Sequence, residues 1–262
     1  MSWETTSGSS ALSILTSSFE RELTQRSMGM GDVGTMAVEE RAHSPSSNAR
    51  YLARATFRLR AAYALGSLLR GNRRACRYFV SMGGPDVLVR VALGTLSSVR
   101  GPFASMNDGI AVLDYKFASR VLALGEDVVM DVVLHGEDGY DDDDEDDATD
   151  VEGGNEASLN ASQMVASFAT ERWCDLTLRM LSPPSDVMGD LTRRSLQQRA
   201  MTAVRALAPA CRERSRDETW GINDVKRVKS EWNREGSDDE LDPVYRKELL
   251  DLADEVLREM RE

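Results

Sequence analysis

Residues 58–93 hold the pattern that most restricts what this chain can fold into. A long helical run ends at Gly71 and Asn72, a shorter run follows, and Gly83 and Gly84 separate it from a third run rich in Leu and Val. Glycine suits the position after a last helical turn because it adopts left-handed backbone angles without a steric cost. Three such helices cannot close a core alone, so the unit is expected to stack against further helices.

The rest of the sequence also predicts helices. Apolar residues recur at helical spacing in the ranges 48–71, 72–82, 85–97, 113–135, 159–182, 186–215, 219–234 and 241–261. Pro209 lies inside one of these ranges and is expected to kink that helix or to start a new turn, because proline lacks an amide N–H. Aromatic residues make up only 6% of the chain, and no part of it alternates strands with helices. We therefore expect an all-α fold.

Two segments stand apart from this helical domain, which is expected to span residues 50–262. Residues 1–49 predict a short amphipathic helix at 11–26 and a flexible linker, a candidate remnant of a truncated repeat. Residues 136–157 are strongly acidic and have no apolar face. Because like charges repel, this insertion is expected to be a disordered loop.

Charge and hydropathy bear on the partners of the chain. A formal net charge of -12 argues against a nucleic-acid partner, because such binding depends on cations that meet phosphates. No apolar run reaches the roughly 18 residues of a membrane span, so no membrane partner is expected. The N-terminus lacks the basic region of a secretory signal. These residues alone predict a cytosolic protein, or a chain that has lost its true N-terminus.

The residues that usually carry chemistry are sparse. Neither His43 nor His135 has a Ser or Cys partner at a known catalytic spacing, and no phosphate-binding loop motif occurs. The three cysteines, Cys76, Cys174 and Cys211, are far apart and form no C-x-x-C pair, which excludes a typical zinc site. Each of them is expected to be a small buried hydrophobic residue. We therefore expect no enzyme activity, no cofactor and no metal.

The unit at 58–93 resembles an armadillo repeat. Its long run, RLRAAYALGSLLRGN, is similar to the third helix of that repeat, and the two glycines match the break before the next unit. Weaker copies of the third helix occur at 116–129 (KFASRVLALGEDVV) and 195–214 (SLQQRAMTAVRALAPACRER). The resemblance implies an armadillo-like helical repeat solenoid.

Four segments in order resemble a narrower family, the armadillo-type exchange factors of the endoplasmic reticulum (the Sil/BiP-associated family). They are AYALGSLLRGNRRACRYFVSMGGPDVL, SRVLALGEDVV, ERWCDLTLRML with APACRER, and YRKELLDLADEVLREM, which together span roughly residues 50–262. This resemblance implies a monomeric co-chaperone that binds the nucleotide-binding domain of an Hsp70-class chaperone, BiP-like, and promotes ADP release. It also implies the lumen of the endoplasmic reticulum. The family carries a secretion signal and further repeats before this point, which are not seen here.

The resemblance also implies which residues would contact the partner. The positions that armadillo proteins point into their groove match, on three successive third helices, Tyr63, Ser67, Arg70, Arg120, Glu126, Arg199 and Arg205. Another interpretation is that these are solvated polar positions, with Tyr63 packed between helices. Two other functions stay open: a cytosolic Hsp70 exchange factor, like the related Fes/Hsp70-binding family, and a general armadillo-like scaffold that binds an extended peptide.

Overall fold

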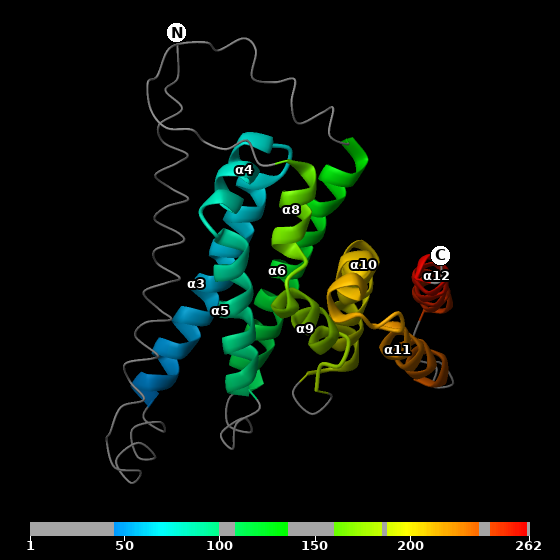
Figure 1. The fold of residues 1–262 in the computed structure, drawn as a ribbon. Helices are drawn as coiled ribbons and strands as arrows, with labels where there is room; N and C mark the ends of the chain where they lie inside the picture. Colours follow the sequence, from blue (N-terminus) through cyan, green and yellow to red (C-terminus); the bar gives the residue numbers. More distant parts are fainter. Residues whose placement is uncertain (1–44, 100–107, 136–159, 185–187, 236–241, 261–262) are drawn as a thin grey trace.

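The computed structural model describes residues 45–99, 108–135, 160–184, 188–235 and 242–260, and every regular element in these ranges is a helix (Figure 1). The helices are α3 (Pro45–Leu69), α4 (Arg73–Ser81), α5 (Gly84–Val99), α6 (Asp108–His135), α8 (Ala161–Phe168), α9 (Glu171–Met180), α10 (Asp190–Ser215), α11 (Ile222–Glu235) and α12 (Pro243–Glu259). The all-α prediction is therefore confirmed for the described ranges. The predicted helix at 11–26 and the acidic insertion at 136–157 lie outside them.

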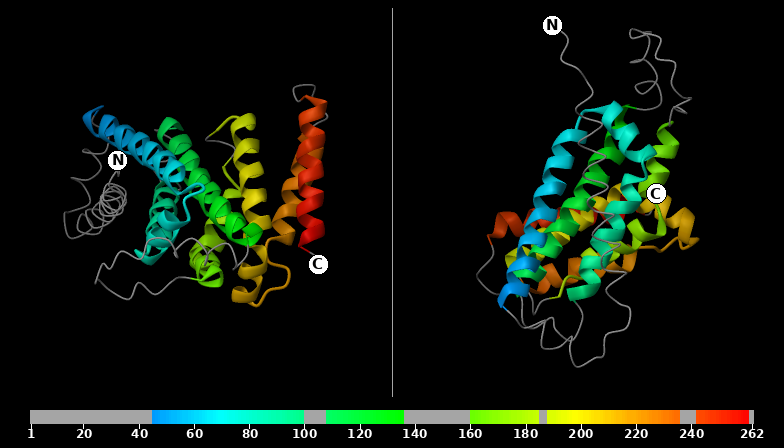
Figure 2. Two further views of the ribbon diagram at one scale, coloured as in Figure 1. Left: turned by 90° about the horizontal axis from the view of Figure 1, so that it is seen from above. Right: turned by 90° about the vertical axis from the view of Figure 1, so that its left-hand side faces the viewer.

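The helices form two layers. In the left view of Figure 2, α3, α6, α10 and α12 follow one another from left to right, α5 and α9 lie below this row, and α11 lies between α10 and α12. Packing contacts agree with this view, because α6 touches both α3 and α10, and α10 touches α12. Between the layers, α5 packs on α6, α9 on α10 and α11 on α12. One continuous apolar core runs between the layers from Ala61 to Met260.

The two glycines between α4 and α5 have different tasks. Gly83 has a φ of 70°, which only glycine adopts without strain. Gly84 is limited by space instead, because a Cβ atom on it would lie 2.1 Å from Cε2 of Phe79. Phe79 is itself buried in the core, so its ring cannot easily move aside. The glycine pair thus lets α5 turn back tightly against α4.

Replacing Gly84 with alanine is expected to lower the free energy of unfolding by about 1–3 kcal/mol or more, the usual cost of overpacking a core. Gly109 gives a matched control, because it is also helical and nothing lies within 4 Å of the position of its added Cβ. Urea unfolding followed by circular dichroism would measure both variants. Equal stability of the Gly84 and Gly109 variants would contradict the close approach of Phe79.

Several predicted boundaries are wrong. The linker expected to reach residue 49 ends earlier, because α3 begins at Pro45, and proline suits the first helical turn. The single helix expected at 159–182 is two helices that meet at Ala169 and Thr170. The break brings Trp173 against the edge of Phe168, with ring centroids 5.2 Å apart. The helix predicted at 186–215 is α10, which begins at Asp190 and continues through Pro209 to Ser215.

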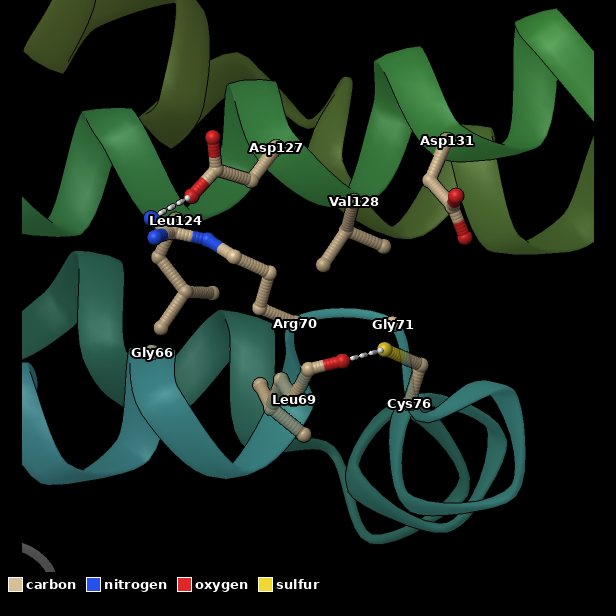
Figure 3. Close-up of a pocket in the computed structure, with 9 residues that line it drawn as sticks. All are labelled: Gly66, Leu69, Arg70, Gly71, Cys76, Leu124, Asp127, Val128 and Asp131. Carbon is tan, nitrogen blue, oxygen red and sulfur yellow. Dashed lines mark hydrogen bonds and ion pairs between the residues drawn. The ribbon is translucent and has the colours of Figure 1, made fainter.

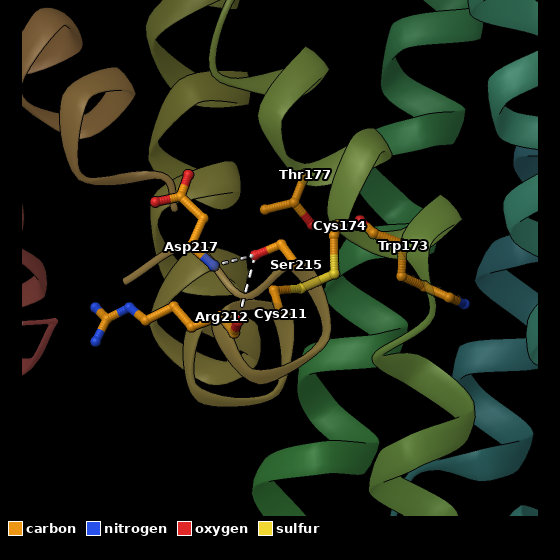
Figure 4. Close-up of a disulfide and its surroundings, with 7 residues drawn as sticks. All are labelled: Trp173, Cys174, Thr177, Cys211, Arg212, Ser215 and Asp217. Carbon is orange, nitrogen blue, oxygen red and sulfur yellow. Dashed lines mark hydrogen bonds between the residues drawn. A yellow bond between two sulfur atoms is a disulfide. The ribbon is translucent and has the colours of Figure 1, made fainter. Parts of the chain in front are cut away.

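The expectation for the cysteines is wrong for two of the three. Cys174 on α9 and Cys211 on α10 form a disulfide, with their Cα atoms 5.8 Å apart (Figure 4). The two residues are 37 positions apart in the sequence, and only the packing of α9 on α10 brings them together. Cys76 is a buried free thiol as expected, and burial raises its pKa to about 12.

Among the described residues, no single helix is long and apolar enough to cross a bilayer. One pair, α4 with α5 up to Ser97, reaches the length and apolar composition of a span only when the two helices are joined across a 70° bend.

Candidate interaction groove

A polar groove of about 370 Å³ lies between α3, α6 and α10. Its lining residues come from all three helices: Arg70, Arg120, Ala123, Glu126, Asp127, Ser195, Gln198, Arg199 and Thr202. Four of them, Arg70, Arg120, Glu126 and Arg199, are among the seven residues that the sequence suggested for partner binding. The structure therefore brings together side chains that are more than a hundred positions apart in the chain.

Arg120 is held in the groove by two residues of α3. Its guanidinium carbon lies 4.8 Å from the centroid of the Tyr63 ring, a cation–π contact. Gly66 lies one turn further along α3, and a Cβ atom there would come within 2.9 Å of Nη2 of Arg120. The side chain of Tyr63 remains 52% exposed, so it is not packed between helices. Tyr63 and Gly66 together position the guanidinium group of Arg120.

Glu126 and Thr202 join α6 to α10 inside the groove. The Thr202 hydroxyl donates a hydrogen bond of 2.9 Å to Oε2 of Glu126. Burial raises the pKa of Glu126, while this hydrogen bond and the nearby Arg199 and Arg205 act to lower it. The net direction is upward, so burial dominates. The ionised carboxylate is therefore less favoured here than in water.

The pKa of Glu126 predicts a dependence of stability on pH. A carboxyl group whose pKa is higher in the folded than in the unfolded chain favours folding when protonated, and this contribution is lost as the pH rises through that window. Glu126→Gln, which keeps an acceptor for Thr202, should therefore raise the melting temperature at pH 7 and have little effect well below the usual glutamate range. Thermal unfolding across pH would measure this. A lower melting temperature of the variant at pH 7 would contradict it.

Arg70 lines the groove and is paired with a carboxylate. Its Nη2 lies 2.9 Å from Oδ2 of Asp127 on α6, and both side chains are largely exposed (Figure 3). The hydrogen bond to Asp127 raises the pKa of Arg70. Next to this pair is a smaller cavity of about 170 Å³, which is also lined by Leu69, Leu124 and Val128, by Cys76 and by the acidic Asp131. The exposed ion pair lines both the groove and this cavity.

Three of the suggested residues do not line the groove: Tyr63, which contacts Arg120 from α3, and Ser67 and Arg205. Arg205 on α10 turns to α12, where it lies 3.2 Å from Glu255 and 2.8 Å from Glu259. The Ser67 hydroxyl donates to the Tyr63 carbonyl on its own helix at 3.0 Å. Arg205 thus joins two helices of the row, and Ser67 has its hydroxyl satisfied locally.

The sequence did not single out Gly66, Asp127, Gln198 or Thr202. Gln198 accepts a hydrogen bond of 3.3 Å from the Tyr245 hydroxyl, which ties the groove to α12. Helical spacing could have suggested Thr202, because it lies three residues after Arg199 and so on the same face. No sequence signal gives the place of Gly66, since its role depends on where Arg120 reaches across from α6.

Among the described residues, no group of three or more His, Cys, Asp or Glu side chains is placed to hold a metal ion. Comparisons of the chain with protein-family models, with curated proteins and with solved structures found no match.

Proposed function

We propose that this protein binds the nucleotide-binding domain of an Hsp70-class chaperone through the groove and promotes ADP release. One observation carries the proposal. The three segments that resemble third helices of armadillo repeats form α3, α6 and α10, which are neighbours in one row, and four of their suggested contact residues line one groove. This is how a helical solenoid would present a binding surface.

The armadillo-like arrangement of the helices is part of the same proposal. We take α3, α6, α10 and α12 as the groove-side layer of an armadillo-like solenoid, and α5, α9 and α11 as its supporting layer. The close turn at Gly83 and Gly84 supports it, because the resemblance has a glycine pair at the break between units.

The proposed activity needs no chemical step by this chain. An exchange factor works by binding the open form of the chaperone more tightly than the closed, ADP-bound form. Binding of the factor and of ADP then oppose each other, and the coupling is reciprocal. The groove would supply polar and cationic contacts for the open form.

The disulfide supports the lumen of the endoplasmic reticulum over the cytosol. Disulfides form and persist in oxidising compartments and are rare in the cytosol, where thiols are kept reduced. The Cys174–Cys211 pair lies within the helices that support the groove. A lumenal, BiP-like chaperone is therefore the proposed partner.

Calorimetric titration of an isolated Hsp70 nucleotide-binding domain would test the partner. We expect the nucleotide-free domain to bind at least about tenfold more tightly than the ADP-loaded domain, a difference of about 1.4 kcal/mol. A polar groove variant, Arg199→Gln, should weaken binding, while Arg172→Gln on the exposed surface of α9 serves as the control. Equal affinity for both forms of the domain would contradict the proposal.

A further inference from the structure

The arginines beside the groove differ in whether a carboxylate neutralises them. Arg70 pairs with Asp127, and Arg205 pairs with Glu255 and Glu259. Within the described residues, Arg120 has no carboxylate at ion-pair distance, and its buried Nε has no hydrogen-bond partner. The Tyr63 ring contacts the face of the guanidinium group, and the N–H groups at the edge of that group remain available to donate hydrogen bonds.

Arg120 is therefore a positioned cation with no carboxylate at ion-pair distance among the described residues. A partly buried guanidinium that lacks an acceptor has lost hydration without full compensation. The Tyr63 ring and the missing side chain at Gly66 fix where the guanidinium lies, so little side-chain entropy remains to be lost on binding. A carboxylate accepts two parallel N–H bonds from such a group, and the bond is stronger than one between neutral groups.

Arg199 adds a second positive charge at the same groove. Arg199 lines the groove from α10, and its charge acts to lower the pKa of the Glu126 carboxyl against the larger effect of burial. Arg120 and Arg199 line the groove from the neighbouring helices α6 and α10. The groove is also lined by Glu126 and by Asp127, whose carboxylate pairs with Arg70.

We propose that this groove binds an acidic segment of the partner protein, with Arg120 as the anchor for a carboxylate, Tyr63 and Gly66 as its positioning residues, and Arg199 as a second contact. The inference rests on the proposed function only for the identity of the partner. The recognised chemistry is a carboxylate on a peptide, with at least two acidic side chains close together.

A fluorescein-labelled hexaglutamate peptide tests the site without a chaperone. Fluorescence anisotropy at low salt should show binding to the wild-type protein, and a hexaglutamine peptide should not bind. Arg120→Gln should weaken the hexaglutamate affinity by about tenfold or more, since close charge pairs of this kind contribute strongly. Arg90→Gln is the matched control, because Arg90 is a half-exposed arginine on α5 that pairs with Asp86.

Gly66→Ala separates a binding role from a structural one. The added Cβ would push only the flexible end of Arg120, and alanine is a better helix former than glycine. The variant should therefore be as stable as wild type or more stable, and should still lose about tenfold in hexaglutamate affinity. The Nε–H resonance of Arg120, assigned with Arg120→Lys, should shift on adding the peptide to wild type and not to Gly66→Ala.

The outcomes separate the inference from the proposed partner. Binding of hexaglutamate that depends on Arg120, with no binding of any Hsp70 domain, would keep the acidic-segment site and remove the chaperone. Hsp70 binding unchanged by Arg120→Gln and by Gly66→Ala would keep the chaperone and overturn the site. No binding of hexaglutamate by the wild-type protein would also overturn the site.

Discussion

Asp114→Ala is expected to lower the free energy of unfolding by about 3–5 kcal/mol, the usual cost of removing one partner of a buried ion pair. Oδ1 of Asp114 lies 2.7 Å from Nη2 of Arg58, and the two side chains are 6% and 5% exposed. The pair joins α3 to α6, the helices that form one side of the groove. The variant leaves the Arg58 charge buried without this carboxylate.

Two further variants make the result specific. Asp175→Ala removes a largely exposed partner of Arg179 within α9, and should cost less than about 1 kcal/mol. Replacing both members of the buried pair, with Arg58→Met and Asp114→Leu, should cost less than Asp114→Ala alone, because no buried charge is left. Urea unfolding would measure all three. A double variant that is less stable than Asp114→Ala would contradict the buried-charge explanation.

Removal of the disulfide is expected to have an effect of similar size. Cys174 and Cys211 are 37 residues apart, and a loop of this length corresponds to about 4 kcal/mol of unfolding free energy in the chain-entropy account. The variant with both Cys174→Ala and Cys211→Ala should lose about this amount, and a thiol reductant should lower wild-type stability similarly. Urea unfolding with and without reductant would measure both.

The reductant provides its own control in that experiment. It should not change the stability of the double variant, because the remaining Cys76 is a free thiol in the core. A wild-type protein whose unfolding is the same with and without reductant would contradict a stabilising link between α9 and α10.

The sequence predicted most of the helices because they depend on local signals. Apolar residues at helical spacing, and glycines at the ends of α3 and α4, need no knowledge of distant parts of the chain. The break between α8 and α9 was missed, since the apolar pattern continues across it. At this break Ala169 and Thr170 lie between the two helices, and Trp173 packs on Phe168 across it.

Contacts between distant segments could not be predicted in this way. The disulfide depends on the packing of α9 on α10. The position of Gln197, which is only 1% exposed, also depends on contacts between distant segments. Its side chain donates to the Leu181 carbonyl and accepts from Nε1 of Trp232 at 2.9 Å, which fixes α10 between α9 and α11. A polar residue on a helix gives no sign of such a role.

The candidate site shows the same division. The resemblance to the third helices of armadillo repeats suggested Arg70, Arg120 and Arg199. Which of them is neutralised depends on the neighbouring helix. Asp127 neutralises Arg70, whereas Tyr63 and Gly66 leave Arg120 held without a carboxylate. That difference between two arginines is what gives the groove a specific anchor.

Release of fluorescent ADP from purified lumenal and cytosolic Hsp70-class chaperones, with and without this protein, tests the central claim most directly. The account predicts faster release from the lumenal chaperone, with the effect reduced by Arg120→Gln and retained by Arg90→Gln. Unchanged release from both chaperones, by a protein that is folded and has its disulfide formed, would contradict it.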